Sequence, residues 1–491
     1  MNESRPQWST PDGDVAGVSG DGVDRALGIR YAVGGRYEVP RPVGPHGGIL
    51  DAVTPAPACP QNPPSTALSV GRTAARLRVD EDCQRLSVHV PAGLPADAQV
   101  PVMVWIHGGA YVSGSGDLPG FDPRKLVTEQ RLVVVTVTYR LGMFGFLGDG
   151  ETAPPNLGLM DIREALRWVR RNIGAFGGDP AKVTAFGQSA GADAIVALMV
   201  ADGRDILEDP AVEPLFDRAI IQSAPFGMHG DRAGMHRDML EAAGPLSADM
   251  TVREMLDAEL RATEAAQDHG LFANMPFGPQ YGHDPLPPRS GVDAALKAVA
   301  PRVEVLVGHT TREAALFSEP REDAQRARRV PVVGDPLMEA ITRHYTRVTY
   351  GPMKRFVDRH ADGGGHGTMY KLDWGPAGSL MRSAHIVDIP LLLGDEDSYA
   401  GSPLVEGLDW AVVDADGRRL RAAWAEFARD GRLGYAGIGS SDPGAVGLKG
   451  TEPFIRFTEF GPAGTAPAGT GSTAAGSHGT EGAPTPPAGA E

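Results

Sequence analysis

Short apolar runs alternate with segments of helical period along the first two thirds of this 491-residue chain. The apolar runs comprise residues 102–106, 132–137, 183–186, 219–221 and 303–307. Runs of this length are typical of buried strands, while residues 161–173 have the period of a helix. Such alternation predicts an α/β fold with a large, mostly parallel central sheet and helices on both faces. Catalytic loops are then expected at the carboxyl ends of the strands.

One serine lies where a predicted strand passes into a predicted helix. The strand of residues 183–186 runs into Gly187-Gln188-Ser189-Ala190-Gly191, and residues 192–200 are compatible with a helix. A Gly-x-Ser-x-Gly pattern in this setting is typical of a nucleophile elbow, in which small residues permit a sharp, strained turn. The serine oxygen then lies at a helix N-terminus that favours negative charge. The alternative is a chance cluster of small residues around a serine.

A second glycine-rich segment follows the strand of residues 102–106. Its sequence is His107-Gly108-Gly109-Ala110-Tyr111. An ester hydrolase needs backbone N–H donors aimed at the oxyanion of its tetrahedral intermediate, and a loop without bulky side chains can present them. An ordinary Gly-Gly turn is the alternative. The position of this segment, about 80 residues before the serine, favours the catalytic interpretation.

Further segments stand in a fixed order around these two motifs. They are Gly28-Ile29-Arg30-Tyr31-Ala32, Thr138-Tyr139-Arg140, Phe144-Gly145-Phe146-Leu147, Asn156-Leu157-Gly158-Leu159-Met160-Asp161 and Phe176-Gly177-Gly178-Asp179-Pro180. From about residue 10 to about residue 460, the chain resembles the type-B carboxylesterases, which include bacterial para-nitrobenzyl esterases, animal carboxylesterases and cholinesterases. The resemblance implies an α/β-hydrolase fold with helical lid insertions in one domain, residues 1–460. It also implies hydrolysis of carboxylic esters through an acyl-serine.

A catalytic serine needs a base, and the base needs a carboxylate to orient it. In this fold the chain order is serine, acid, histidine. The resemblance assigns the acid to Glu313, after the strand of residues 303–307, where the family has Gly-x-x-x-Asp-Glu-Gly. Arg312 and Ala314 depart from that motif. Two alternatives remain: Glu313 is a solvated glutamate at a helix start, or the acid is Glu304, inside the strand.

The base is expected among 13 histidines. His385 begins a segment similar to the family's His-x-x-Asp/Glu-Leu-Pro, 72 residues after the acid. A structural histidine is the alternative. His360 and His366, in a glycine-rich stretch, and His478, near the C-terminus, are expected to be solvated, and His107 is expected to shape the oxyanion loop.

The resemblance assigns further residues to the site and its surroundings. The oxyanion donors would be the N–H groups of Gly109, Ala110 and Ala190. Cys59 and Cys83 lie in segments that many relatives join by a disulfide, whereas in the cytoplasm these thiols would stay reduced, so both states remain open. The sequence has no C-x-x-C and no Cys/His cluster, so no metal and no cofactor is expected.

Composition narrows the range of partners. The net charge of −16 disfavours nucleic acid. No apolar run is long enough to span a membrane, and the first six residues lack a signal-peptide core, so a cytoplasmic location is expected. Residues 461–491 contain no Val, Ile, Leu, Met or aromatic residue and are expected to be a disordered tail. The oligomeric state is left open.

The expected partner is a small-molecule ester. No tryptophan lies between Cys59 and Cys83 to hold a quaternary ammonium, which disfavours choline esters. An acyltransferase with the same acyl-enzyme and a catalytically inactive binding module are the alternative functions. Residues 222–313 and 318–378 are expected to form the lid. Five apolar residues there either line the substrate pocket or belong to the core: Phe226, Met228, Phe272, Met275 and Phe277.

Overall fold

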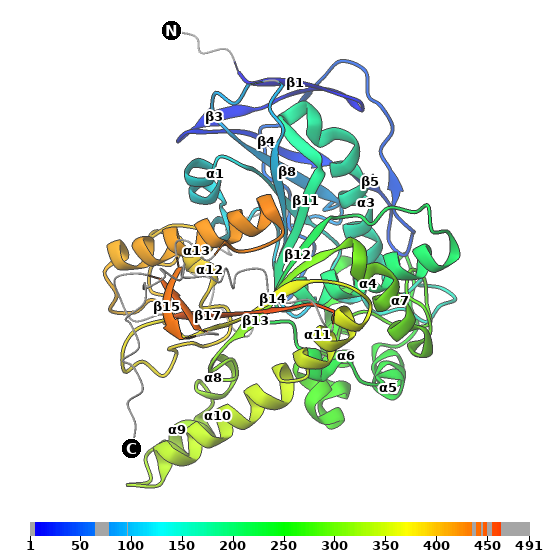
Figure 1. Ribbon diagram of the computed structural model, residues 1–491. Coiled ribbons are helices and arrows are strands. Elements are labelled where there is room, and N and C mark those ends of the chain that lie inside the picture. The colour runs from blue at the N-terminus through cyan, green and yellow to red at the C-terminus, as the bar shows by residue number, and fades with distance from the viewer. Residues whose placement is uncertain are drawn as a thin grey trace, which may run out of the picture.

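The computed structural model describes residues 5–63, 78–95, 97–434, 438–442, 445–448 and 454–462. Ten strands of this described part form one sheet in the order β17-β14-β13-β12-β11-β9-β10-β8-β4-β3 (Figure 1). In chain order they are β3 (Val18–Gly20), β4 (Val23–Arg30), β8 (Arg85–Pro91), β9 (Val100–Ile106), β10 (Val133–Thr138), β11 (Gly178–Gln188), β12 (Arg218–Gln222), β13 (Glu304–Thr310), β14 (Gly367–Leu372) and β17 (Ile455–Phe460).

Six neighbouring strands of this sheet are mutually parallel, namely β10, β9, β11, β12, β13 and β14. The antiparallel strands β8 and β17 flank them, one on each side. Strand β10, Val-Val-Val-Thr-Val-Thr, is buried at every position. Such continuous apolar runs occur in parallel strands because helices cover both faces of the sheet. The predicted α/β fold with a large, mostly parallel sheet and helices on both faces is therefore confirmed.

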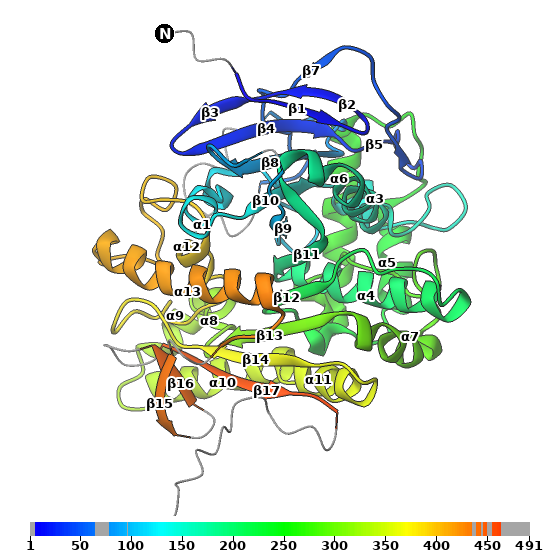
Figure 2. The ribbon, with the colours of Figure 1, turned by 45° about the horizontal axis from the view of Figure 1, so that its top comes forward.

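Alternate residues of the central strands pack into two separate cores, one on each face of the sheet. Val102, Val104 and Ile106 of β9 join the core under α3 (Leu157–Asn172) and α4 (Ala190–Glu208). Met103 and Trp105 join the other core, under α1 (Arg124–Gln130) and α13 (Trp410–Asp430). Figure 2 shows the two helical layers on opposite sides of the sheet.

The remaining elements surround this frame. The other helices are α2 (Gly142–Gly145), α5 (Ala233–Ala243), α6 (Val252–Ala265), α7 (Val292–Val299), α8 (Ala315–Ser318), α9 (Glu322–Arg328), α10 (Gly334–Tyr350), α11 (Met353–Asp362) and α12 (Ile389–Leu392). The other strands are β1 (Gln7–Thr10), β2 (Gly13–Ala16), β5 (Ala32–Val33), β6 (Arg41–Pro42), β7 (Ile49–Asp51), β15 (Ile438–Asp442) and β16 (Ala445–Leu448). Helices α5 to α7 and α9 to α11 lie in the chain regions predicted to form the lid, whereas α8 falls between these two regions apart from its last residue.

No helix in the described ranges is long and apolar enough to cross a membrane. Of the predicted tail, residues 463–491 lie outside the described residues, as does His478.

Candidate active site

Ser189 stands at the sharp turn between β11 and α4. Its backbone has φ 58° and ψ −123°, a conformation that costs free energy for any residue other than glycine. The neighbouring glycines make the turn possible, because a Cβ on Gly191 would lie 2.0 Å from the carbonyl oxygen of Ile106 and one on Gly187 would lie 2.7 Å from it. The end of β9 therefore fits against the elbow only when both positions carry no side chain.

The glycine-rich loop after β9 lies against the same turn. A Cβ on Gly108 would be 3.2 Å from Cβ of Ser189. Gly109, Ala110 and Tyr111 all have positive φ, which places three successive residues in conformations that L side chains rarely adopt. In the part of the chain that the structure describes, the N–H groups of Gly109 and Ala110 donate to no other group. Ala190 begins α4, so its N–H has no acceptor one turn earlier within the helix.

The ring of His107 supports this loop. Its Nδ1 lies 2.8 Å from the carbonyl oxygen of Gly108, and its ring stacks on that of Tyr139 with a centroid distance of 4.4 Å. Burial lowers the pKa of His107 to about 4, so the ring is neutral at neutral pH. These contacts fit the expectation that His107 shapes the loop rather than transferring protons.

Glu313 lies just after β13 and is fully buried. Its Oε1 accepts hydrogen bonds of 2.6 Å from the N–H of Thr310 and from the hydroxyl of Ser223, and its Oε2 lies 2.5 Å from Nδ1 of His385. Burial alone would raise the pKa of Glu313, but His385, His309 and the Ser223 hydroxyl outweigh it and lower the pKa. The interpretation of Glu313 as a solvated glutamate is therefore wrong.

The other sequence candidate for the acid, Glu304, begins β13, where burial raises the pKa of its carboxyl. It lies at the opposite end of the strand from Thr310, whose N–H binds Glu313. Arg312, which departs from the family motif, points elsewhere: it donates to the carbonyl oxygen of Leu380 at 2.8 Å and pairs with Glu339 at 3.0 Å.

His385 is buried, and its backbone N–H donates to the carbonyl oxygen of Glu313 at 3.2 Å. With Nδ1 facing the Glu313 carboxylate, the neutral ring carries its proton there and leaves Nε2 as an acceptor. The side-chain amide nitrogen of Gln188 lies 3.2 Å from Nε2. Among the residues that the structure describes, the Ser189 hydroxyl makes no hydrogen bond. The structure thus joins Glu313 to His385 and places the residue next to Ser189 against the base.

Three neighbours of this pair escaped the sequence analysis. They are Ser223, which binds Glu313, Gln188, and Tyr350, whose hydroxyl lies 3.2 Å from Nδ1 of His385. Gln188 was visible as the variable residue of the serine motif. Tyr350 carries no local signal, because only the packing of α10 brings it to the site.

Asp388, three residues after His385, forms a second buried acid near the pair. Its Oδ2 accepts a 2.6 Å hydrogen bond from the Gln222 amide, and its Oδ1 has no partner within the described residues. Gln222 in turn accepts from the indole of Trp424 on α13 at 3.2 Å. Burial raises the pKa of Asp388 to about 6.

The prediction that His360 is solvated is wrong. Its side chain is 1% exposed and stacks on Phe356, one turn earlier in α11, at 6.0 Å. Phe356, Val357 and His360 form one buried face of that helix, and burial lowers the pKa of His360 to about 4. His366 is half-buried.

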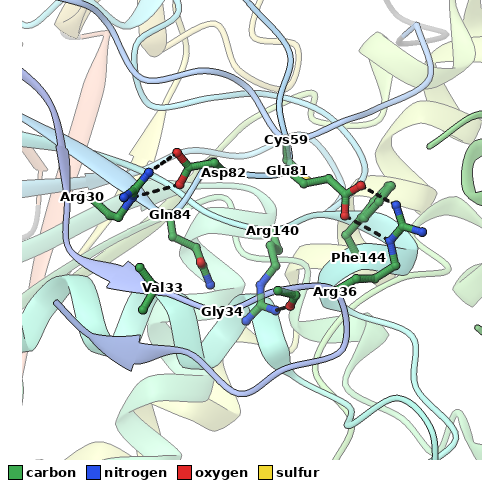
Figure 3. A pocket seen from close by; sticks show the side chains of 11 residues that line it. Arg30, Val33, Gly34, Arg36, Cys59, Glu81, Asp82, Gln84, Arg140 and Phe144 are labelled. Atoms are coloured by element: carbon green, nitrogen blue, oxygen red, sulfur yellow. Dashed lines mark hydrogen bonds and ion pairs between the residues drawn. The ribbon is translucent and has the colours of Figure 1, made fainter. Parts of the chain in front are cut away.

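Cys59 and Cys83 are buried and unbridged. A hydrogen bond with Cys59, together with burial, raises the pKa of the Cys83 thiol. The two sulfurs are thus neighbours, and of the two states that the sequence left open the structure has the free thiols. Cys59 also lines a pocket of about 360 Å³ whose charged groups are already paired, Arg30 with Asp82 and Arg36 with Glu81 (Figure 3).

The five apolar residues proposed for pocket or core belong to the core or pack against it. Four are buried in the core between the sheet and the α3–α4 layer, and Phe272 is partly buried against it. The described residues contain no cluster of three or more His, Cys, Asp or Glu side chains able to hold a metal ion.

A mostly parallel sheet with a serine at a strand-to-helix elbow defines an α/β-hydrolase. A family model described as the carboxylesterase family matches residues 4–346. A probable N-octanoylanthranilate hydrolase of Rhodococcus erythropolis, AqdA2, is 36% identical over 425 residues, which cover 85% of this chain and 91% of that protein. The para-nitrobenzyl esterase of Bacillus subtilis (strain 168) is 32% identical over 461 residues, which cover 86% and 89%.

A solved structure of a thermophilic PNB esterase aligns with a TM-score of 0.71 at 28% identity, covering 89% of this chain and 93% of that one. The chain therefore belongs to the carboxylesterase family and is a carboxylesterase, as the sequence motifs predicted.

Proposed function

We propose that this carboxylesterase works through an acyl-serine, with Ser189 as nucleophile, His385 as general base and Glu313 as the carboxylate that orients it. The observation that carries the proposal is the buried Glu313–His385 pair beside the strained elbow of Ser189. A carboxylate on Nδ1 keeps Nε2 free to accept a proton, and it stabilises the imidazolium that then forms.

In the proposed reaction, the Ser189 oxygen attacks the ester carbonyl while its proton passes to Nε2 of His385. The N–H groups of Gly109, Ala110 and Ala190 bind the oxyanion. Their proximity to the elbow supports this role, and the N–H groups of Gly109 and Ala110 have no other acceptor among the described residues. The imidazolium then protonates the leaving alcohol, and a water molecule, activated by the same ring, releases the acid.

Gln188 must yield Nε2 before the first step, because one lone pair cannot accept from both the amide and the Ser189 hydroxyl. Catalytic hydrogen bonds are often misaligned in structures without substrate and tighten once substrate binds. We therefore assign the Gln188 contact to the resting enzyme.

A panel of p-nitrophenyl esters from acetate to octanoate tests the proposal on wild type and on Ser189→Ala, His385→Ala and Glu313→Gln. The octanoyl end of the panel is included because a relative is named for an N-octanoyl substrate. A fluorophosphonate probe is expected to label Ser189 in the wild type. Ester hydrolysis by a Ser189→Ala variant that circular dichroism shows to be folded would refute Ser189 as the nucleophile.

A further inference from the structure

A second pocket, of about 230 Å³, opens beside the start of α5. Its buried polar residues are Arg232, His236 and Gln280, and Leu240, Pro279 and Tyr281 contribute its less polar walls. Its rim carries Arg237, Arg289, His283, Asp149 and Asp231. Ser189, Glu313 and His385 do not line it, so it is separate from the proposed catalytic group.

Arg232 brings a buried positive charge to this pocket. Arg232 is only 5% exposed. Its Nη2 donates to the carbonyl oxygen of Met275, and its Cζ lies 5.8 Å from the centroid of the Phe272 ring. Within the described ranges no carboxylate forms an ion pair with it, and its Nε has no acceptor. A buried charge without a hydrogen-bonded counter-ion is costly, so this guanidinium favours an anion beside it.

Asp193, the acid whose charge acts on Arg232, does not fill that role by contact. Asp193 acts on Arg232 through space and raises the pKa of the guanidinium, against a larger lowering by burial that brings this pKa to about 10. Both Asp193 oxygens are already engaged, Oδ2 by the Tyr111 hydroxyl at 2.6 Å and Oδ1 by the His229 ring. Arg232 thus stays charged at neutral pH and keeps a free donor.

His236 adds a second unused donor one helical turn away. Its backbone N–H donates to the carbonyl oxygen of Arg232 at 2.9 Å, which fixes the two side chains on one face of the helix start. The residue is 9% exposed, and its Nε2 has no partner in the described part of the chain. Burial, with help from Arg232 and Arg289, lowers the pKa of His236 to about 3. The neutral ring offers one N–H donor.

We propose that this pocket binds a small organic carboxylate, held by Arg232 and His236 with Arg289 at the rim. Arginine suits a carboxylate because its N–H groups form charge-assisted hydrogen bonds to both oxygens. The volume exceeds the roughly 30 Å³ share of one water molecule several times over, which leaves space for an organic body beside Leu240 and Tyr281. Asp149 and Asp231 at the rim repel a dianion more than a monoanion, which disfavours phosphate.

Calorimetric titration of the full-length enzyme with benzoate, its neutral isostere benzamide and inorganic phosphate tests the proposal. Benzoate is expected to bind, and benzamide and phosphate are expected to bind at least about tenfold more weakly. Arg232→Gln and Arg289→Gln should each weaken benzoate binding by about tenfold to a hundredfold, the effect of losing a charged hydrogen bond. Arg253→Gln, which removes an exposed arginine on α6, is the matched control and should leave binding unchanged.

Two further measurements place the ligand in this pocket. In NMR spectra, benzoate should shift the ring signals of His236 and raise its pKa, because a nearby anion stabilises the imidazolium. Ser189→Ala should bind benzoate as the wild type does, so failure of the catalytic proposal would not affect this test. Benzamide binding as tight as benzoate binding would overturn the proposal. So would benzoate binding by Arg289→Gln equal to that of the wild type, together with His236 ring signals that do not shift on adding benzoate. Both outcomes can be measured even if Arg232→Gln fails to fold.

Discussion

Replacing Glu313 by Gln removes the negative charge beside His385 and keeps the shape of the side chain. The carbonyl oxygen of Gln can still accept from Thr310 and Ser223, so the fold should survive. The amide nitrogen would face Nδ1, now 2.5 Å from a carboxylate oxygen, and would donate to it. That donation forces the ring proton onto Nε2, where it blocks proton transfer from Ser189.

The electrostatic part of the loss follows from the separation of the charges. Two unit charges about 4 Å apart, at an effective dielectric constant of about 20, attract by about 4 kcal/mol, which is about a thousandfold in rate. The tautomer change adds to this, and the matching substitution in a serine protease lowers kcat about ten-thousandfold. We therefore expect Glu313→Gln to lower kcat by a thousandfold to ten-thousandfold on this scale, with a much smaller change in KM.

Steady-state hydrolysis of p-nitrophenyl butyrate measures the effect, and thermal unfolding confirms that the variant is folded. Glu304→Gln is the matched control, since it removes the other candidate glutamate, at the far end of β13, and should leave kcat within a factor of two or so, as for substitutions away from the reacting groups. A Glu313→Gln enzyme with kcat within tenfold of wild type would refute the assigned role.

Three further outcomes follow from the same geometry. In urea denaturation, the free energy of unfolding of Ser189→Gly should be about 1 kcal/mol higher than that of Ser189→Ala, because glycine adopts the positive φ of this position without strain and alanine does not. Equal free energies of unfolding would show that the elbow is not strained. Gly191→Ala should lower the free energy of unfolding by about 1–3 kcal/mol or more and abolish turnover, since its Cβ would lie 2.0 Å from the Ile106 carbonyl oxygen. Gly174→Ala is the control and should behave as wild type, because no atom of the described residues lies within 4 Å of its added Cβ. Burial raises the folded-state pKa of Asp388 from 3.8 to about 6, so its carboxyl lowers the stability of the fold as pH rises through that window. The free energy of unfolding of Asp388→Asn relative to wild type should therefore grow by about 3 kcal/mol between those pH values and then level off. A difference that does not change with pH would show that the pKa of this carboxyl is not raised.

The fold could be predicted because its signals are local. Five of the six parallel strands, all but β14, contain an apolar run, and the elbow requires glycines at fixed spacing from the serine. Helix α13 (Trp410–Asp430) contains a glycine that local sequence does not explain. Gly417 interrupts the propensity, yet a Cβ there would lie 2.6 Å from the Leu391 carbonyl oxygen, so packing against α12 accounts for the glycine.

The buried state of His360 was missed for a similar reason. Three glycines at residues 363–365 suggest an open loop, but they follow α11 rather than interrupt it. A Cβ on Gly365 would lie 2.3 Å from Nε2 of His360, so the glycine allows the chain to close over the ring. Local polarity thus indicated solvent where tertiary packing covers the side chain.

The departures at Arg312 and Ala314 weakened the sequence case for Glu313 more than the structure warrants. The Glu313 carboxylate is fixed by the Thr310 N–H, by Ser223 from the end of β12 and by His385, and none of these contacts involves its two chain neighbours. Arg312 turns to Glu339 on α10, while the N–H of Ala314 donates to Thr346 on the same helix. The Arg312 side chain and the Ala314 backbone N–H therefore both tie the acid turn to α10, the helix that also supplies Tyr350 to the His385 ring. What varies at this turn is its attachment to the lid region, while the groups that hold the carboxylate come from the ends of the parallel strands and from His385.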